Sequence, residues 1–156
     1  MATAALRAAL AVLLPAAAQA SQAAPAAPVV AQCRITEASL FRADAKGALR
    51  PAPAQALAAG ITLRLLKTES GDLDVEIHGP SSTATLRDSA AQVQTEFFNG
   101  AAMLSAITPA GAAERFFFQL GPQGGQVIWT VIHNFRDADG AGRFLLDTAT
   151  YVGDCH

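Results

Sequence analysis

Four side chains that can bind metal ions or carry protons alternate along one short stretch of the chain. They are Asp72, Asp74, Glu76 and His78. In an extended strand, residues two apart lie on the same face, and two ligands at this spacing can chelate a metal ion. Arg64 is expected opposite Glu76, however, and Arg87 close to Asp72 or Asp74. We therefore interpret the stripe as the solvated, charge-paired face of a sheet and predict no metal.

A second acidic stretch, residues 137–142, reads Asp-Ala-Asp-Gly-Ala-Gly. This is the spacing found at the start of a calcium-binding loop. Such a loop also needs an oxygen ligand at its fifth position and a glutamate at its twelfth. Those positions hold Ala141 and Thr148. Because Asp and Gly between two apolar runs are typical of a turn, we interpret the stretch as a turn that needs no cation.

The nearest approach to an acid–base pair is His133 with Asp147. The hairpin register derived below places the two on opposite faces, so a hydrogen bond between them is not expected. No serine stands in a nucleophile-elbow context, and the two cysteines are expected to be paired. These observations favour a non-catalytic protein over the alternative of a hydrolase with dispersed catalytic residues.

Residues 126–155 predict two long strands joined by a polar turn that contains glycine. Trp129 and Val131 alternate onto one face of the first strand, and Phe144 and Leu146 share one face of the returning strand. We expect these two apolar faces to form a single surface that contributes to the core.

Two loops are compatible with that pairing. A tight Asp139-Gly140 turn is the stronger local signal, but it sets two arginines opposite each other, which is destabilising. A four-residue loop at 137–140 instead sets Thr130 opposite Asp147, and we prefer it. The two registers differ by an even step, so both keep Trp129 on the predicted face.

The chain begins with the features of a secretory signal peptide. These are Arg7, an apolar run at 8–14, the break at Pro15, and Ala18-Gln19-Ala20 before Ser21. The apolar run is too short for a membrane span. We predict cleavage after Ala20, a loose Ala/Pro-rich lead-in at 21–31, and a single domain at 32–156 that is periplasmic or secreted.

The chain has two cysteines, Cys33 and Cys155. In an exported protein this number predicts one disulfide. The bond would close a loop of 155 − 33 + 1 = 123 residues, which the chain-entropy model values at roughly 5 kcal/mol. Lipid modification of Cys33 is the alternative, but Gln32 is bulky where lipidation requires a small residue.

Strand-like runs separated by turn residues recur at intervals of about ten residues. They begin near Ile61, Asp72, Ser82, Gln92, Ala101, Glu114, Gln126 and Arg143, after a short strand at 32–36. The pattern predicts an all-β fold, an antiparallel meander of about eight strands that forms a small barrel, a cupped sheet or a sandwich. Pro53 and Gly60 delimit a short N-terminal helix. We expect the segment 37–60 to cover the Ile128 face of the final hairpin.

Burial and charge together decide the first hairpin loop. A three-residue loop at 69–71 places Leu65 opposite Val75 and Arg64 opposite Glu76. A two-residue turn would instead place Leu65 opposite Glu76. We therefore predict the three-residue loop, with Gly71 in the left-handed region.

Asn99-Gly100 is a strong signal for a type I′ turn. A helix at 90–97 competes with it, because Val93 and Phe97 are also four residues apart. We prefer the hairpin, which aligns Thr95 with Leu104.

The formal net charge is −2 and becomes −3 when Arg7 is removed with the signal peptide. A charge of this sign does not indicate nucleic acid or an anionic membrane as a partner. No cofactor signature is present, so we predict no cofactor and no membrane insertion of the mature chain.

An apolar lining with few polar groups is typical of a small-molecule pocket. The predicted ligand site consists of Trp129, Val131, Phe116, Phe118 and Phe144. The same side chains can instead simply fill the core, because small barrels are often packed solid. We interpret the protein as a binding module for a small apolar ligand or an envelope component. The alternative is a protein-interaction or inhibitor module of the cell envelope.

Overall fold

The computed structural model describes residues 27–44, 46–90, 92–109, 111–136 and 144–156. The predicted signal peptide, most of the lead-in and the acidic stretch at 137–142 lie outside these residues. The side chains of residues 134–136 and 144–146 lie outside them as well. Among the described helices, none is long and apolar enough to cross a membrane.

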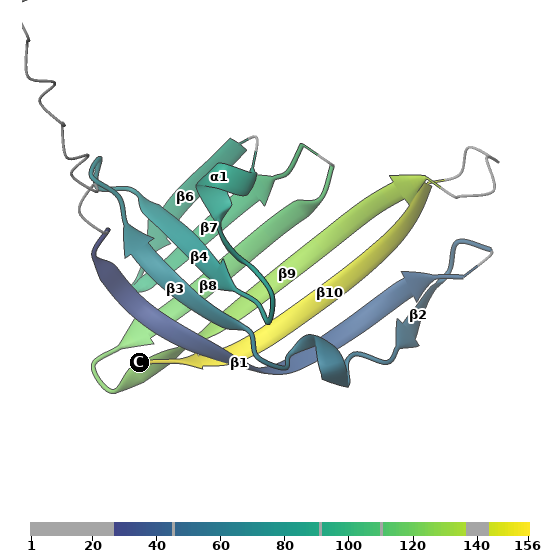
Figure 1. The fold of residues 1–156 in the computed structure, drawn as a ribbon, viewed down its shortest axis with the longest axis horizontal. Helices are drawn as coiled ribbons and strands as arrows, with labels where there is room; N and C mark the ends of the chain where they lie inside the picture. Colours follow the sequence, from purple (N-terminus) through teal and green to yellow (C-terminus); the bar gives the residue numbers. More distant parts are fainter. Residues whose placement is uncertain (1–26, 45, 91, 110, 137–143) are drawn as a thin grey trace, which may run out of the picture.

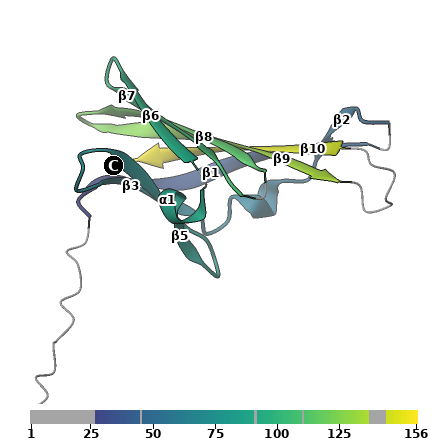
Figure 2. The same cartoon turned by 90° about the horizontal axis from the view of Figure 1, so that it is seen from above.

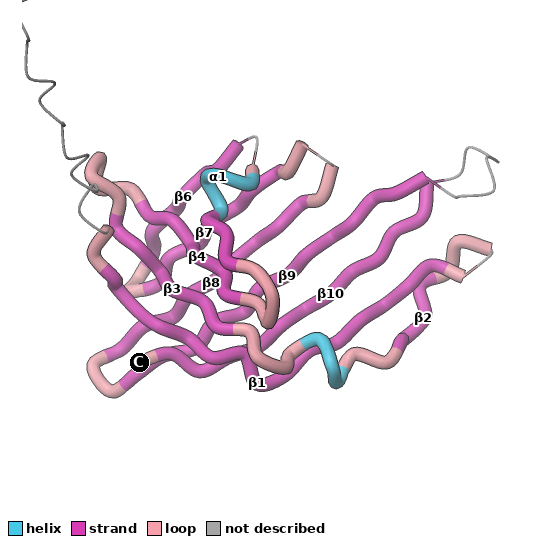
Figure 3. The backbone as a smooth tube through the Cα atoms, in the orientation of Figure 1, coloured by secondary structure: helices cyan, strands magenta, loops and turns pink. Residues whose placement is uncertain are grey.

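Within the described residues, ten strands form one antiparallel sheet (Figures 1 and 3). They are β1 (Val29–Ala43), β2 (Leu49–Ala52), β3 (Thr62–Lys67), β4 (Leu73–His78), β5 (Thr83–Thr85), β6 (Gln92–Phe98), β7 (Ala101–Ile107), β8 (Ala113–Gly121), β9 (Gly124–Arg136) and β10 (Phe144–Cys155). Two short helices accompany them, the 3-10 helix η1 (Gln55–Leu57) and the α-helix α1 (Leu86–Ser89). The predicted all-β fold is confirmed.

The strand order is β5-β4-β3-β1-β10-β9-β8-β7-β6, with β2 pairing to β1. β3 to β5 and β6 to β10 are two meanders, and β1 joins them. The first half of β1 pairs with β3 and its last residues pair with β2, while β10 pairs with β1 along the opposite side. The fold is therefore two meanders connected through one long central strand.

The sheet curls into a half-barrel, so that β3 and β4 lie across β6, β7 and β8 (Figures 1 and 2). The edge strands β5 and β6 are consecutive in sequence, and α1 between them contacts β4, β5 and β6. Thr85 caps this helix by accepting a hydrogen bond from the Asp88 amide at 3.2 Å. The helix inserts Leu86, which has no exposed surface, into the opening between the two edges.

The strand beginnings predicted from the sequence agree with the structure from β3 to β10. The predicted strand at 32–36 lies in the first half of a longer β1, which also takes in residues 29–31 of the predicted lead-in. The predicted helix between Pro53 and Gly60 is reduced to η1. The segment 37–60 does not cover the Ile128 face. Instead, Ala54 packs on Leu40 of β1, and Ile128 remains 44% exposed.

Two hairpin registers are confirmed. β3 and β4 place Leu65 opposite Val75 and Arg64 opposite Glu76, and Gly71 has the positive φ that the three-residue loop requires. β6 and β7 place Thr95 opposite Leu104. In their turn, Asn99 and Gly100 have φ angles of 46° and 79°, as a type I′ turn requires.

The predicted register of the final hairpin is wrong. Asp147 pairs with His133 rather than with Thr130, a shift of 133 − 130 = 3 residues. An odd shift exchanges the faces of β10 relative to β9, so Trp129 lies opposite Tyr151. Position 144 pairs with Arg136 and does not belong to the alternating set of Trp129.

The disulfide explains why β10 adopts this register. Cys155 pairs directly with Cys33, and both side chains are buried in the core, joined by the predicted bond. Side chains alternate along a strand. Since Cys155 faces the core, Gly153, Tyr151 and Ala149 also face it.

One hydrophobic core fills the concave side of the half-barrel. Its members come from β1, β3, β4, α1 and β7 to β10. The largest side chains without appreciable exposure are Phe116, Phe118, Leu63, Leu65, Leu86 and Leu104. β3, β4 and α1 lie over one part of the concave face of β8, β9 and β10 and leave the rest of its length uncovered (Figure 1).

Candidate functional site

Four of the five predicted ligand-site residues are buried in the core. Phe116 and Phe118 on β8 have no exposed surface, and Trp129 and Val131 on β9 are 8% and 4% exposed. Phe144 begins β10, but its side chain lies outside the described residues. The four described side chains act as core residues in this structure, and their part in ligand binding stays a prediction.

The aromatic side chains of the concave face form a stacked row across three strands. The ring of Trp129 stacks on Phe116 with centroids 5.3 Å apart and on Tyr151 with centroids 4.4 Å apart. The three residues pair directly across β8, β9 and β10. Cross-strand aromatic pairs of this kind stabilise a sheet, so the row stabilises the centre of the concave face.

Glu114 is a half-buried polar residue of the concave face that the predicted site does not include. It shares the concave face of β8 with Phe116, and its carboxylate accepts a hydrogen bond from Trp129 Nε1 at 3.0 Å. Burial raises the pKa of Glu114, whereas the bond from Trp129 and the nearby His133 oppose the rise. Burial also raises the pKa of Tyr151, and the charge of Glu114 adds to that rise.

The alternation of β8 was sufficient to locate Glu114, because residues 114, 116 and 118 share one face of an extended strand. The three residues stand in the sequence Glu-Arg-Phe-Phe-Phe. The Phe triplet hides this signal, since an all-apolar centre suits either face. A carboxyl group of raised pKa beside aromatic rings can exchange a proton or bind a hydrogen-bond donor. In this structure Trp129 is the donor.

His133 and Asp147 share the face of Trp129, which corrects the prediction that they lie on opposite faces. They are directly paired across β9 and β10. The described interaction of Asp147 is an ion pair with Arg42 of β1, whose Nε lies 3.3 Å from its Oδ2. His133 is exposed. The structure brings His133 and Asp147 to one end of the concave face, and no hydrogen bond between their side chains is among the described contacts.

The acidic stripe of β4 has the charge pairing that the sequence predicted. Glu76 Oε2 lies 2.7 Å from Arg64 Nη1 and 2.7 Å from His78 Nε2. Arg87 Nη2 lies 3.7 Å from Asp72. The hydrogen bond from His78, together with the charges of His78 and Arg64, holds the pKa of Glu76 below its ordinary value.

Asp74 differs from the rest of the stripe because it is buried. Its Oδ1 accepts hydrogen bonds from the backbone amides of Val75, at 2.8 Å, and Arg87, at 3.2 Å. Burial nevertheless raises the pKa of Asp74. Its role in the fold is to fasten the start of α1 to β4. Over the described residues, no group of three or more His, Cys, Asp or Glu side chains is placed to hold a metal ion.

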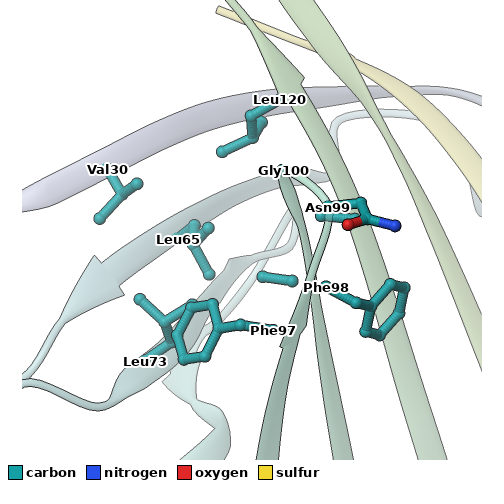
Figure 4. Close-up of a pocket in the computed structure, with 10 residues that line it drawn as sticks. Val30, Leu65, Leu73, Phe97, Phe98, Asn99, Gly100 and Leu120 are labelled. Carbon is teal, nitrogen blue, oxygen red and sulfur yellow. The ribbon is translucent and has the colours of Figure 1, made fainter.

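The concave side has an apolar pocket of about 370 Å³ at the end where the β6–β7 turn approaches β1 and β3 (Figure 4). We call it the end pocket. Its lining consists of Val30, Leu65, Leu73, Phe97, Phe98, Asn99, Gly100, Ala101, Ala102 and Leu120. Phe97 projects toward Leu65 and Leu73, while Phe98 points to the other side of the hairpin (Figure 4).

This pocket differs from the packed core because one of its aromatic side chains, Phe97, is mostly exposed. Its side chain is 66% exposed although it stands on the concave face of β6. Leu65 and Leu73, on the opposite wall, are 1% and 6% exposed. An apolar wall that is firmly held therefore faces an aromatic ring with most of its surface free.

A second pocket of about 510 Å³ lies alongside the outward-facing residues of β6 to β9. Its outward-facing lining mixes amide, hydroxyl and guanidinium groups with apolar chains, among them Gln94, Ser105, Arg115, Thr130 and Ile132. Gln94, Ser105, Arg115 and Thr130 form one row of directly paired positions across the four strands. The end pocket is thus the more apolar of the two.

Comparison with known proteins adds no relative to this description: no protein-family model, no curated protein and no solved structure matches the chain.

Proposed function

We propose that the chain is an exported, non-catalytic binding protein and that it holds a small apolar ligand in the end pocket. The observation that carries this proposal is Phe97, an aromatic side chain 66% exposed at the edge of an apolar hollow. Small-molecule sites are concave and mostly apolar, with few polar groups. At about 370 Å³ the pocket lies at the small end of the range of ligand sites.

Export is supported by two features. The first 20 residues have the pattern of a signal peptide, and the Cys33–Cys155 disulfide is the kind of bond that persists in an oxidising compartment. A ligand of the periplasm or the extracellular space is accordingly the class to test.

Ligand binding at the end pocket is tested with two neighbouring valines of similar exposure. Val30 lines the pocket and is 48% exposed, whereas Val29 is 45% exposed and does not line it. The probe is 1-anilinonaphthalene-8-sulfonate, followed by its fluorescence, together with native mass spectrometry of protein purified from the periplasm. Val30→Asp places a charge in an apolar site and is expected to weaken probe binding about tenfold or more.

Val29→Asp is the matched control and should bind the probe as the wild type does. Equal binding by the two variants would move the site elsewhere. A wild-type protein that binds no probe and carries no co-purifying mass would refute the ligand-binding proposal.

A further inference from the structure

β6, which the four-residue helix α1 contacts, is an edge strand of the sheet. It is the last strand in the sheet order among the described strands and it is seven residues long. Its sequence, Gln-Val-Gln-Thr-Glu-Phe-Phe, has no proline and no lysine, and its pairing with β7 has no bulge. Natural proteins usually shorten, charge or cover such edges to prevent pairing with another chain. The other edge, β5, has only three residues and leads into α1.

The hairpin geometry determines which peptide groups of β6 point outward. In a two-residue hairpin, the residues that flank the turn form a hydrogen-bonded pair, and such pairs alternate along the strands. Phe98 flanks the turn, so the peptide groups of residues 98, 96, 94 and 92 point toward β7. Those of Val93, Thr95 and Phe97 point toward the free edge.

An antiparallel partner with the same sequence fits this edge best when Thr95 lies on the two-fold axis. Val93 then pairs with the partner's Phe97 and Phe97 with the partner's Val93. All three outward-pointing residues of each copy join hydrogen-bonded pairs. A two-fold axis at Gln94 uses only two of the three described residues, and one at Glu96 sets two like charges directly opposite, which is destabilising.

The Thr95 register also agrees with the charges and the burial of β6. Gln94 lies opposite the partner's Glu96, so no like charges meet on the convex face. The partner's Val93 meets Phe97, which is 66% exposed in the single chain. Both contacts recur twice in the pair, as an isologous interface requires.

We propose that two copies of the chain form a two-fold dimer by antiparallel pairing of their β6 strands about Thr95. The dimer continues the sheet of one half-barrel into the other. Both concave faces then lie on the same side of the joined sheet, because the two-fold axis is perpendicular to it. The proposal concerns the strand edge and does not depend on a ligand in the end pocket.

The test uses two substitutions at Gln94, which is exposed and pairs with the neutral Ser105 inside the chain. Gln94→Glu sets like charges opposite the partner's Glu96 twice, and we expect the dimer to dissociate about tenfold more readily. Gln94→Lys sets opposite charges there and should strengthen the dimer by a similar factor. Sedimentation velocity over a concentration series, with the disulfide intact, measures both.

Thr95→Pro removes an outward-pointing amide without removing a β6–β7 hydrogen bond, and it should yield a monomer. Far-ultraviolet circular dichroism shows whether this variant remains folded.

The two Gln94 variants test the register independently of Thr95→Pro. Opposite effects of Gln94→Glu and Gln94→Lys support the Thr95 register. Equal weakening of the dimer by both substitutions would instead point to a two-fold axis at Gln94. A wild-type protein that is monomeric at every concentration would refute the proposal, and so would a dimer that neither substitution affects.

Discussion

Glu114 shows how one residue alters the chemistry of a whole face. It stands in a row of directly paired positions that is otherwise apolar, with Ala106, Val131, Ala149 and Leu40. A half-buried carboxyl group in such a row needs a hydrogen-bond partner, and Trp129 Nε1 supplies it at 3.0 Å. The bond fixes the indole between Phe116 and Tyr151, so the polar group and the aromatic row position each other.

The raised pKa of Glu114 predicts a pH dependence of stability. Because burial raises the pKa above its ordinary value of 4.5, the folded protein retains this proton at pH values where the unfolded chain has lost it. Stability therefore falls as the pH rises from below 4.5 through the pKa of the folded state. Glu114→Gln keeps an acceptor for the indole but has no proton to lose. We expect it to be more stable than the wild type at neutral pH and equally stable well below pH 4.5.

Urea unfolding at the two pH values measures this difference. Glu37→Gln, on the exposed side of β1, is the matched control and should be the same as the wild type at both. A difference between Glu114→Gln and the wild type that does not change with pH would show that shape, and not ionisation, is responsible.

At the scale of the element, β10 is positioned by its close approach to β1. The pairing of the two strands shifts register between Ile35 and Glu37, beside Gly153. A Cβ atom on Gly153 would lie 2.5 Å from the carbonyl oxygen of Arg34. Only glycine allows the two backbones to approach this closely, and this approach lets β10 continue past the irregularity to Cys155.

Gly153→Ala is accordingly expected to destabilise the protein by about 1–3 kcal/mol, because the strands must separate to admit the methyl group. The free energy of unfolding in urea measures the effect. Gly79→Ala is the control, since a Cβ atom there would lie 3.7 Å from its nearest neighbour. Similar losses from both variants would contradict the steric explanation.

At the scale of the molecule, the disulfide joins β1 to β10 at the place where the two meanders meet. Cys33 and Cys155 are 122 positions apart in sequence, and their Cα atoms lie 4.0 Å apart. The backbone continues the connection, because the Gln32 and His156 amides each donate to the other residue's carbonyl, at 3.0 and 2.9 Å. In the unfolded state, the bond therefore closes a loop that contains nearly all of the residues of the folded domain.

Replacing both cysteines by alanine is expected to lower the free energy of unfolding by roughly 2–5 kcal/mol, because a long loop gains entropy when it is released. Urea unfolding of the variant and the wild type gives this difference. Alkylation of the native protein without reduction, followed by intact mass, should add no label. Two labelled thiols would show that the bond does not form.

Much of the fold follows from local signals in the sequence. The turn at Asn99-Gly100 and the joint fit of Leu65 to Val75 and of Arg64 to Glu76 each depend on residues close together in the chain. Turn chemistry and cross-strand pairing act over that range. The disulfide also followed from the sequence, because two cysteines in a chain with a predicted signal peptide leave one possible pair.

The tertiary structure alone decided the register of β10, the length of β1 and the end pocket. β9 and β10 carry apolar residues on both faces, so a one-step slip costs little hydrophobic burial and the alternation cannot choose a face. The choice is made by Cys155, which must enter the core to reach Cys33 and takes Tyr151 inward with it. β1 extends because its partners come from distant parts of the chain. The pocket exists only where the curled sheet brings Phe97 opposite Leu65 and Leu73.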